Sequence, residues 1–229
     1  MKNNIRKLGF WSSAISFIIS IAYIICFVCN YSGNSSFTWT NSVDFINYAN
    51  THSEIFKYIA MALMPILSFC FLIQLECLRE TVDSEKHFFV STATHFAIGF
   101  SVLVGINYFV QISAIRLQVA SNKAEAVSQF VQANPISFIS AVNMLGWTVF
   151  FGIACIFASL AMKNERKERS IKYSFLINGI MMLTSSIAYT FNITIILAIF
   201  MFIGLGAALI IESISLCLYF SRIQLLQKQ

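Results

Sequence analysis

Charged residues are scarce in this chain. Asp, Glu, Lys and Arg make up 11% of its 229 residues, whereas soluble domains contain about 25%. Proline occurs only twice, so little interrupts a helix, while 58% of the residues are hydrophobic and the mean hydropathy is +0.74. Helices that are apolar on every face belong in lipid or in the core of a large protein, and this chain is too short for such a core. The composition excludes a soluble domain and predicts an all-α integral membrane protein.

Catalytic and metal-binding motifs are also missing. The three histidines, His52, His87 and His95, are not spaced to share a metal ion on one helix. The chain contains no H-E-x-x-H, no paired C-x-x-C zinc pattern, no G-x-S-x-G elbow and no phosphate-binding glycine loop. The sequence therefore assigns no catalytic residue, no metal ligand and no cofactor, and it argues against an enzyme without excluding one.

Two of the six cysteines are close together in the sequence. Cys26 and Cys29 form a C-x-x-C motif near the outer end of the first apolar segment. Membrane enzymes that generate disulfides use such a pair beside a quinone, but they also need a second thiol pair in an external loop. Neither long outer loop contains a cysteine, so we interpret the six cysteines as small buried hydrophobic residues. The role of the pair stays open.

Six apolar segments are long enough to cross a bilayer, which takes about 20 residues in a helix. They are Gly9–Asn30, Ile55–Leu78, Ser91–Arg116, Ile136–Met162, Tyr173–Tyr189 and Thr194–Phe220. The last two belong to one nearly unbroken apolar stretch, which is too long for a single span, and Tyr189–Asn192 is the most polar place for a turn. We therefore predict a single membrane domain of six helices covering residues 1–229.

The distribution of Lys and Arg predicts the orientation of the bundle, since cytoplasmic loops are enriched in these residues. With both termini inside, twelve lie on the cytoplasmic side: Lys2, Arg6, Lys7, Arg79, Lys86, Lys163, Arg166, Lys167, Arg169, Lys172, Arg222 and Lys228. Only Lys57, Arg116 and Lys123 lie outside, in or beside the outer loops 31–54 and 117–134. The net charge of +5 is thus a topology signal and does not indicate nucleic acid. The basic inner loop 163–172 is suited to anionic headgroups.

Polar side chains inside the predicted spans are the best candidates for function, because they are costly in hydrocarbon. On the cytoplasmic side these are Glu76, His95, Asn178 and Glu212. They could form a pocket for a cation, a proton or a polar ligand. In the structural alternative, Glu76 and His95 reach the headgroups and Glu212 bonds to a neighbouring helix. Glu212 is the strongest candidate, because apolar runs flank it and it has no obvious local cation before Arg222.

A second set of polar side chains lies toward the outer side. It comprises Asn107, Gln111 and Arg116 on the third span and Asn143 on the fourth. Asn107 and Gln111 are four residues apart and share a helix face. The set could bind a ligand from outside, with Arg116 meeting an anionic group. Alternatively, the amides bond between helices and Arg116 reaches the interface.

In size and span number the chain is similar to the substrate-binding subunits of energy-coupling vitamin transporters and to small permease subunits of ATP-driven exporters. The first group carries alanines four apart on the first span, and Ser16 and Ser20 stand in comparable positions here. The resemblance implies a transporter ATPase or another membrane subunit as partner, besides the lipid bilayer. The abundance of Ile, Asn, Lys, Phe and Ser favours a bacterial source, and hence the cytoplasmic membrane.

The sequence supports two functions. The first is a non-enzymatic subunit that binds a ligand or takes part in transport. The alternative is an enzyme acting on a lipid or quinone, which requires Glu76, His95 and Glu212 to approach within about 3–4 Å of one another, directly or through one water. The ligand, the transport direction and the oligomeric state are not determined by the sequence.

Overall fold

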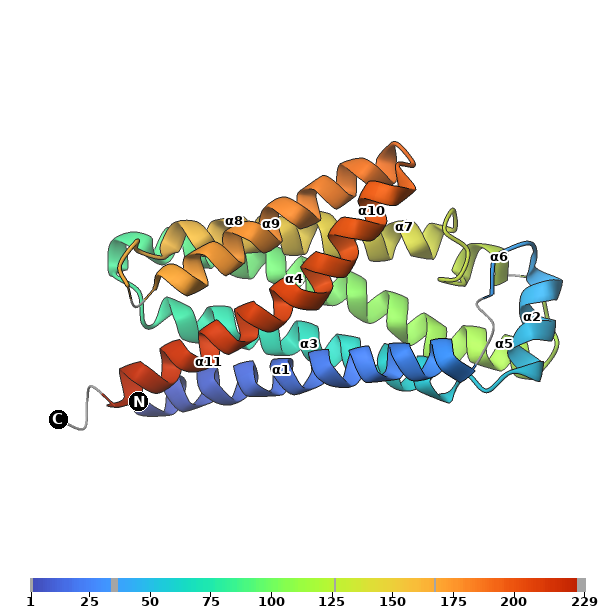
Figure 1. The fold of residues 1–229 in the computed structure, drawn as a ribbon, viewed down its shortest axis with the longest axis horizontal. Helices are drawn as coiled ribbons and strands as arrows, with labels where there is room; N and C mark the ends of the chain where they lie inside the picture. Colours follow the sequence, from blue (N-terminus) through green and yellow to red (C-terminus); the bar gives the residue numbers. More distant parts are fainter. Residues whose placement is uncertain (1, 34–36, 126, 167, 226–229) are drawn as a thin grey trace.

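The computed structural model describes residues 2–33, 37–125, 127–166 and 168–225, and it is a bundle of long helices (Figure 1). In chain order the helical segments are α1 (Lys2–Gly33), α2 (Ser42–Thr51), α3 (Ile55–Arg79), η1 (Ser84–Lys86), α4 (His87–Val110), η2 (Gln111–Ile115), α5 (Arg116–Ala120), α6 (Val127–Phe130), α7 (Phe138–Met144), η3 (Leu145–Phe150), α8 (Phe151–Ala161), α9 (Arg169–Thr190), α10 (Thr194–Met201), η4 (Phe202–Ala208) and α11 (Leu209–Leu225). The described residues contain no strand, so the predicted all-α class is confirmed.

Within the described residues, six continuous helical stretches are long and apolar enough to cross a membrane: Asn4–Asn30, Ile55–Arg79, Ser84–Ala120, Phe138–Ala161, Arg169–Thr190 and Thr194–Arg222. They match the six predicted spans, with boundaries that differ by a few residues at most ends. The start of α1 and the end of α11 lie at the same end of the bundle, which we call the terminal end (Figure 1). The opposite end is called the distal end. The cytoplasmic placement of the terminal end remains a prediction from the charge distribution.

The turn between α9 and α10 falls where the sequence places it. Asn192 adopts φ 54°, in the left-handed region that Asn tolerates better than most residues. Ile193 N donates to Ala188 O at 2.7 Å, the long bond of a Schellman motif that ends a helix. The long apolar stretch is therefore two helices joined at Asn192.

Two features close the ends of the bundle. At the distal end α2, α5 and α6 form a cap (Figure 1) around a small apolar cluster that consists of Phe45, Ile46, Ile115, Val119, Val127 and Val131. At the terminal end Lys163 Nζ donates to Asp83 Oδ2 at 2.7 Å and joins the two loops that follow α3 and α8. This hydrogen bond and the charge of Asp83 raise the pKa of the Lys163 ammonium group.

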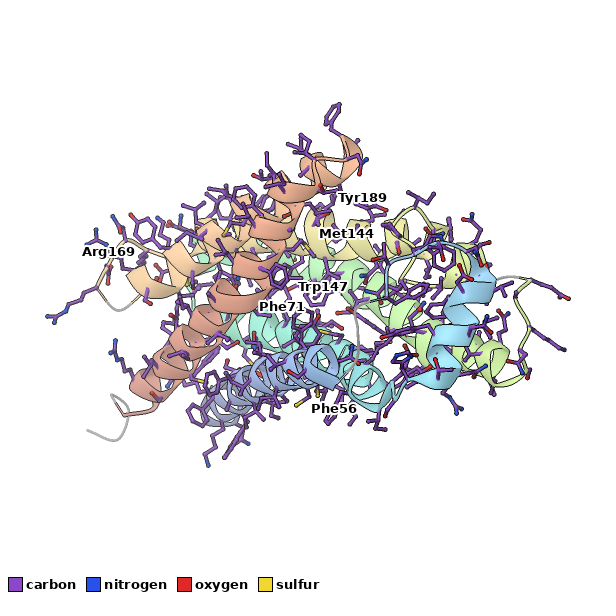
Figure 2. All side chains as sticks on the ribbon, turned by 45° about the vertical axis from the view of Figure 1, so that its right-hand side comes forward. Phe56, Phe71, Met144, Trp147, Arg169 and Tyr189 are labelled. Atoms are coloured by element: carbon purple, nitrogen blue, oxygen red, sulfur yellow. The ribbon has the colours of Figure 1, made fainter. Side chains whose placement is uncertain are left out.

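The centre of the bundle is aromatic and closely packed. The rings of Phe71 and Phe151 lie 4.9 Å apart, and those of Phe100 and Trp147 lie 4.8 Å apart, both edge to face. Figure 2 shows Phe71 and Trp147 inside the bundle. The last span behaves differently: α11 packs on α1 and α9, whereas α10 packs chiefly on α9 (Figure 1). The α10–α11 helix therefore crosses the bundle diagonally and diverges from α1 toward the distal end.

Candidate functional site

The first polar cluster lies between α8, α9 and α11 and is centred on Glu212. The Glu212 side chain accepts a hydrogen bond at Oε2 from Asn178 Nδ2 at 2.6 Å, and Cys155 Sγ lies 4.0 Å from the same oxygen. Relative exposure is 1% for Glu212 and 0% for Asn178 and Cys155. Three helices thus bury a carboxyl, an amide and a thiol together in the interior of the bundle.

This cluster is incompletely hydrogen bonded. Glu212 Oε1 and Asn178 Oδ1 are both buried and have no hydrogen-bond partner among the described residues. In that part of the chain Glu212 also forms no ion pair with Lys, Arg or His. A buried polar atom without a partner costs about 1–3 kcal/mol, so two of them mark Glu212 and Asn178 as a candidate binding site.

Three of the predicted residues lie away from this cluster. Glu76 is about two-fifths exposed and forms an ion pair with Arg79 at 3.2 Å, His95 is exposed on α4, and Arg116 is exposed with its Nε donating to Ile112 O at 3.1 Å. Within the described residues Glu76, His95 and Glu212 share no hydrogen bond or ion pair. The direct contacts that would support the enzyme alternative are therefore not observed among the described residues, and that alternative stays an untested prediction.

The amides of the third span hold the loop that precedes α7. Asn107 Nδ2 donates to Gln132 Oε1 at 3.2 Å, and Gln111 bonds twice, to Phe130 O at 2.8 Å and from Gln132 N at 2.9 Å. The prediction that Asn107 and Gln111 share a helix face is confirmed, since both side chains form hydrogen bonds with the segment 130–132. Gln111 is satisfied by the backbone and has a structural role.

A second polar cluster surrounds the hydroxyl of Tyr108 on α4. The side chains of Gln132, Asn143 and Trp147 approach this hydroxyl, and Tyr108, Asn143 and Trp147 are all buried. Three buried atoms here have no partner among the described residues, namely Asn107 Oδ1, Asn143 Oδ1 and Trp147 Nε1. Like the cluster around Glu212, this one is therefore incompletely hydrogen bonded.

Three neighbouring cavities lie beside this cluster, and Tyr23 lines all three. The largest has a volume of about 460 Å³ and lies between α1 and the α10–η4 segment, where it is lined by Tyr23, Ile24, Phe27, Met201, Phe202, Leu205, Gly206 and Ala207. We call it the lateral groove. A cavity of about 30 Å³ shares Tyr23 and Leu205 with the groove and reaches Tyr108 and Trp147.

The third cavity, of about 120 Å³, lies at the distal end and is here called the polar pocket. It shares Tyr23 and Phe27 with the lateral groove and also contacts Tyr108, Gln132 and Lys57. The rings of Phe27 and Phe202 meet edge to face at 5.9 Å across the groove. An apolar groove and a polar pocket thus lie side by side, with Tyr23 in the walls of all three cavities.

The Cys26 and Cys29 thiols are free, as are the other four cysteines. No group of three His, Cys, Asp or Glu side chains within the described ranges could hold a metal ion. The chain matches no protein-family model, and no curated protein and no solved structure is significantly similar to it. Its fold nevertheless defines a class: it is a multi-pass helical membrane protein, and its function must be argued from geometry.

Sequence reasoning missed several residues of these clusters. It treated Cys155 as a small apolar residue, and it did not single out Tyr108, Gln132 or Trp147. Gln132 lies in an irregular loop, and no periodicity indicates where such a loop folds back. The signal that could have found Tyr108 is its place directly after Asn107 in an apolar span.

Proposed function

We propose that the protein is a non-enzymatic membrane subunit that binds an amphipathic lipid, with the apolar chain in the lateral groove and the head in the polar pocket. The observation that carries this proposal is the adjacency of the two cavities, which share Tyr23 and Phe27. A cavity of about 460 Å³ lies within the range of about 300–1,000 Å³ of small-molecule sites.

The walls of the lateral groove favour a hydrocarbon chain. They are aliphatic and aromatic, with the hydroxyl of Tyr23 as the only side-chain polar atom among the lining residues. Water is poorly stabilised in such a site, because apolar walls do not replace the hydrogen bonds that it makes in bulk solvent. The groove also lies between two lipid-facing helices, so the hydrocarbon chains of the bilayer are its nearest apolar ligands.

The polar pocket favours a head group without net charge. Lys57 is the one cation that lines it among the described residues, and its pairing with Glu54 at 2.6 Å leaves little positive charge for an anion. The hydroxyls of Tyr23 and Tyr108 and the amides of Asn30 and Gln132 also line the pocket, and these uncharged groups offer hydrogen bonds of both kinds. Neutral or zwitterionic lipids fit this chemistry.

The experiment compares two glycine variants by native mass spectrometry after gentle extraction. A Cβ atom on Gly206 meets no atom within 4 Å, and Gly206 lines the groove, so Gly206→Leu places an apolar side chain in the groove from a position with room for its Cβ. We expect the wild type to retain one lipid species in stoichiometric amount. Gly206→Leu should retain it about tenfold more weakly, equivalent to about 1.4 kcal/mol.

The matched control is Gly105→Leu on α4. Its Cβ also meets no atom within 4 Å, but Gly105 lines none of the three cavities. Equal lipid retention by both variants, or no selective lipid on the wild type, would contradict the proposal. A second copy of the chain, a transporter ATPase or another copurifying subunit whose binding is lost in Gly206→Leu would show that the groove is a protein interface instead.

A further inference from the structure

Within the described residues the Glu212 carboxyl has no cation beside it to stabilise a negative charge. It is 1% exposed, it lies among α8, α9 and α11, and among the described residues its one nitrogen donor is the Asn178 amide. A buried carboxylate normally needs a cation or several donors, because desolvation strongly disfavours the charged form. The packing therefore favours the neutral acid.

The hydrogen-bond geometry points the same way. The distance of 2.6 Å between Glu212 Oε2 and the Asn178 amide is short for N–H···O, which is about 2.9–3.0 Å, and ordinary for O–H···O, which is about 2.7–2.8 Å. The two ends of an amide are assigned from the hydrogen-bond network. If the Asn178 amide is turned over, a protonated Oε2 donates to Oδ1 at this distance.

We propose that Glu212 is a proton-binding site, occupied at neutral pH, whose proton is held by Asn178 while α11 packs against α9, with Cys155 of α8 beside it. Release breaks the O–H bond, leaves the electron pair on the carboxylate and passes the proton to water that reaches Glu212 when α11 moves away from α9. This inference does not depend on lipid binding in the lateral groove.

The other groups around Glu212 do not offer it a charge. Cys155 is the titratable side chain that faces it from α8, and Asn178, which does not titrate, faces it from α9. Helix α1 also packs on α11. Its Arg6 interacts electrostatically with Tyr219, which lies two turns after Glu212 on α11. Arg222 follows on the same helix at ten residues, about 15 Å.

The last span contains an irregular backbone segment close to Glu212, which supports a rearrangement of this helix. The π-helical segment η4 ends at Ala208, one turn before Glu212. Such segments inside α-helices often occur at functional sites, and here the segment also forms part of the lateral groove. The proton site and the groove therefore lie on one helix.

Infrared spectroscopy of the full chain in lipid nanodiscs tests the inference. At neutral pH the spectrum of the wild type minus Glu212→Gln should contain the carbonyl-stretch band of one protonated carboxyl group. The matched control is Glu76→Gln, which removes a half-exposed, ion-paired carboxylate. Its difference spectrum should contain carboxylate bands only.

Two further results could overturn the inference. Carboxylate bands in the Glu212→Gln difference spectrum would mean that Glu212 is ionised, and a dependence of those bands on sodium would make it a cation site. If Glu212→Gln does not fold, Asn178→Ala is the second variant. Removing the hydrogen-bond partner of Glu212 should shift the carbonyl-stretch band of its protonated carboxyl toward that of a free carboxyl. An unshifted band would show that Asn178 does not hold the proton.

Discussion

Replacing Glu212 by lysine is expected to destabilise the folded bundle more than any other single charge change discussed here. A lysine at the centre of a membrane helix costs about 2.5–3.5 kcal/mol. At position 212 it would meet an amide and a thiol, with no carboxylate in contact among the described residues. The measurement is the amount of monodisperse protein in detergent and its apparent melting temperature, both of which should fall sharply.

The comparison variant for this prediction is Glu212→Gln. Glutamine has the shape of the neutral acid and can bond to the Asn178 amide, so its yield and melting temperature should stay near those of the wild type. A lysine variant as stable as the glutamine variant would mean that Glu212 reaches water, contrary to its burial of 99%.

Replacing Gly179 by leucine is expected to separate α8 from α9. A Cβ atom on Gly179 would lie 2.7 Å from Ile156 Cδ1 and 2.9 Å from the backbone oxygen of Gly152. A backbone oxygen cannot move aside like the end of a side chain, and overpacking of this kind costs about 1–3 kcal/mol. The apparent melting temperature of Gly179→Leu should therefore fall clearly below that of the wild type.

Gly105→Leu again provides the control, because the same side chain enters open space there. The crossing of α8 and α9 also positions Asn178, so Gly179→Leu should weaken the bond between Asn178 and Glu212. Equal melting temperatures for the two leucine variants would show that α8 and α9 are not in close contact at Gly152 and Gly179.

The membrane spans could be predicted from sequence because each depends on a local window of apolar residues. The second span begins at Ile55 as predicted, and the polar residues around Asn192 correctly located the last turn. The fourth span begins two residues later than predicted, because Ser137 caps it by accepting a hydrogen bond from Ser140 N at 3.1 Å. Local rules therefore account for the number of spans and for most of their ends, whereas the third helical stretch, Ser84–Ala120, extends beyond the predicted Ser91–Arg116 at both ends.

The candidate sites could be predicted only in part. Glu212 stands out in sequence as an isolated charge in an apolar run, but its contacts depend on how α8, α9 and α11 are rotated against one another. The lateral groove depends on the angle between α1 and the last helix, which no pattern in either helix encodes. Tertiary packing, rather than periodicity, determines which polar atoms meet.

The most direct test of lipid binding is a structure of the full chain in lipid nanodiscs, determined by electron cryomicroscopy with a bound antibody fragment. The account predicts chain-shaped density in the lateral groove beside Tyr23 and Gly206, ending at the polar pocket near Tyr108. If η4 packs directly against α1 and the groove is closed without such density, the proposed function is contradicted.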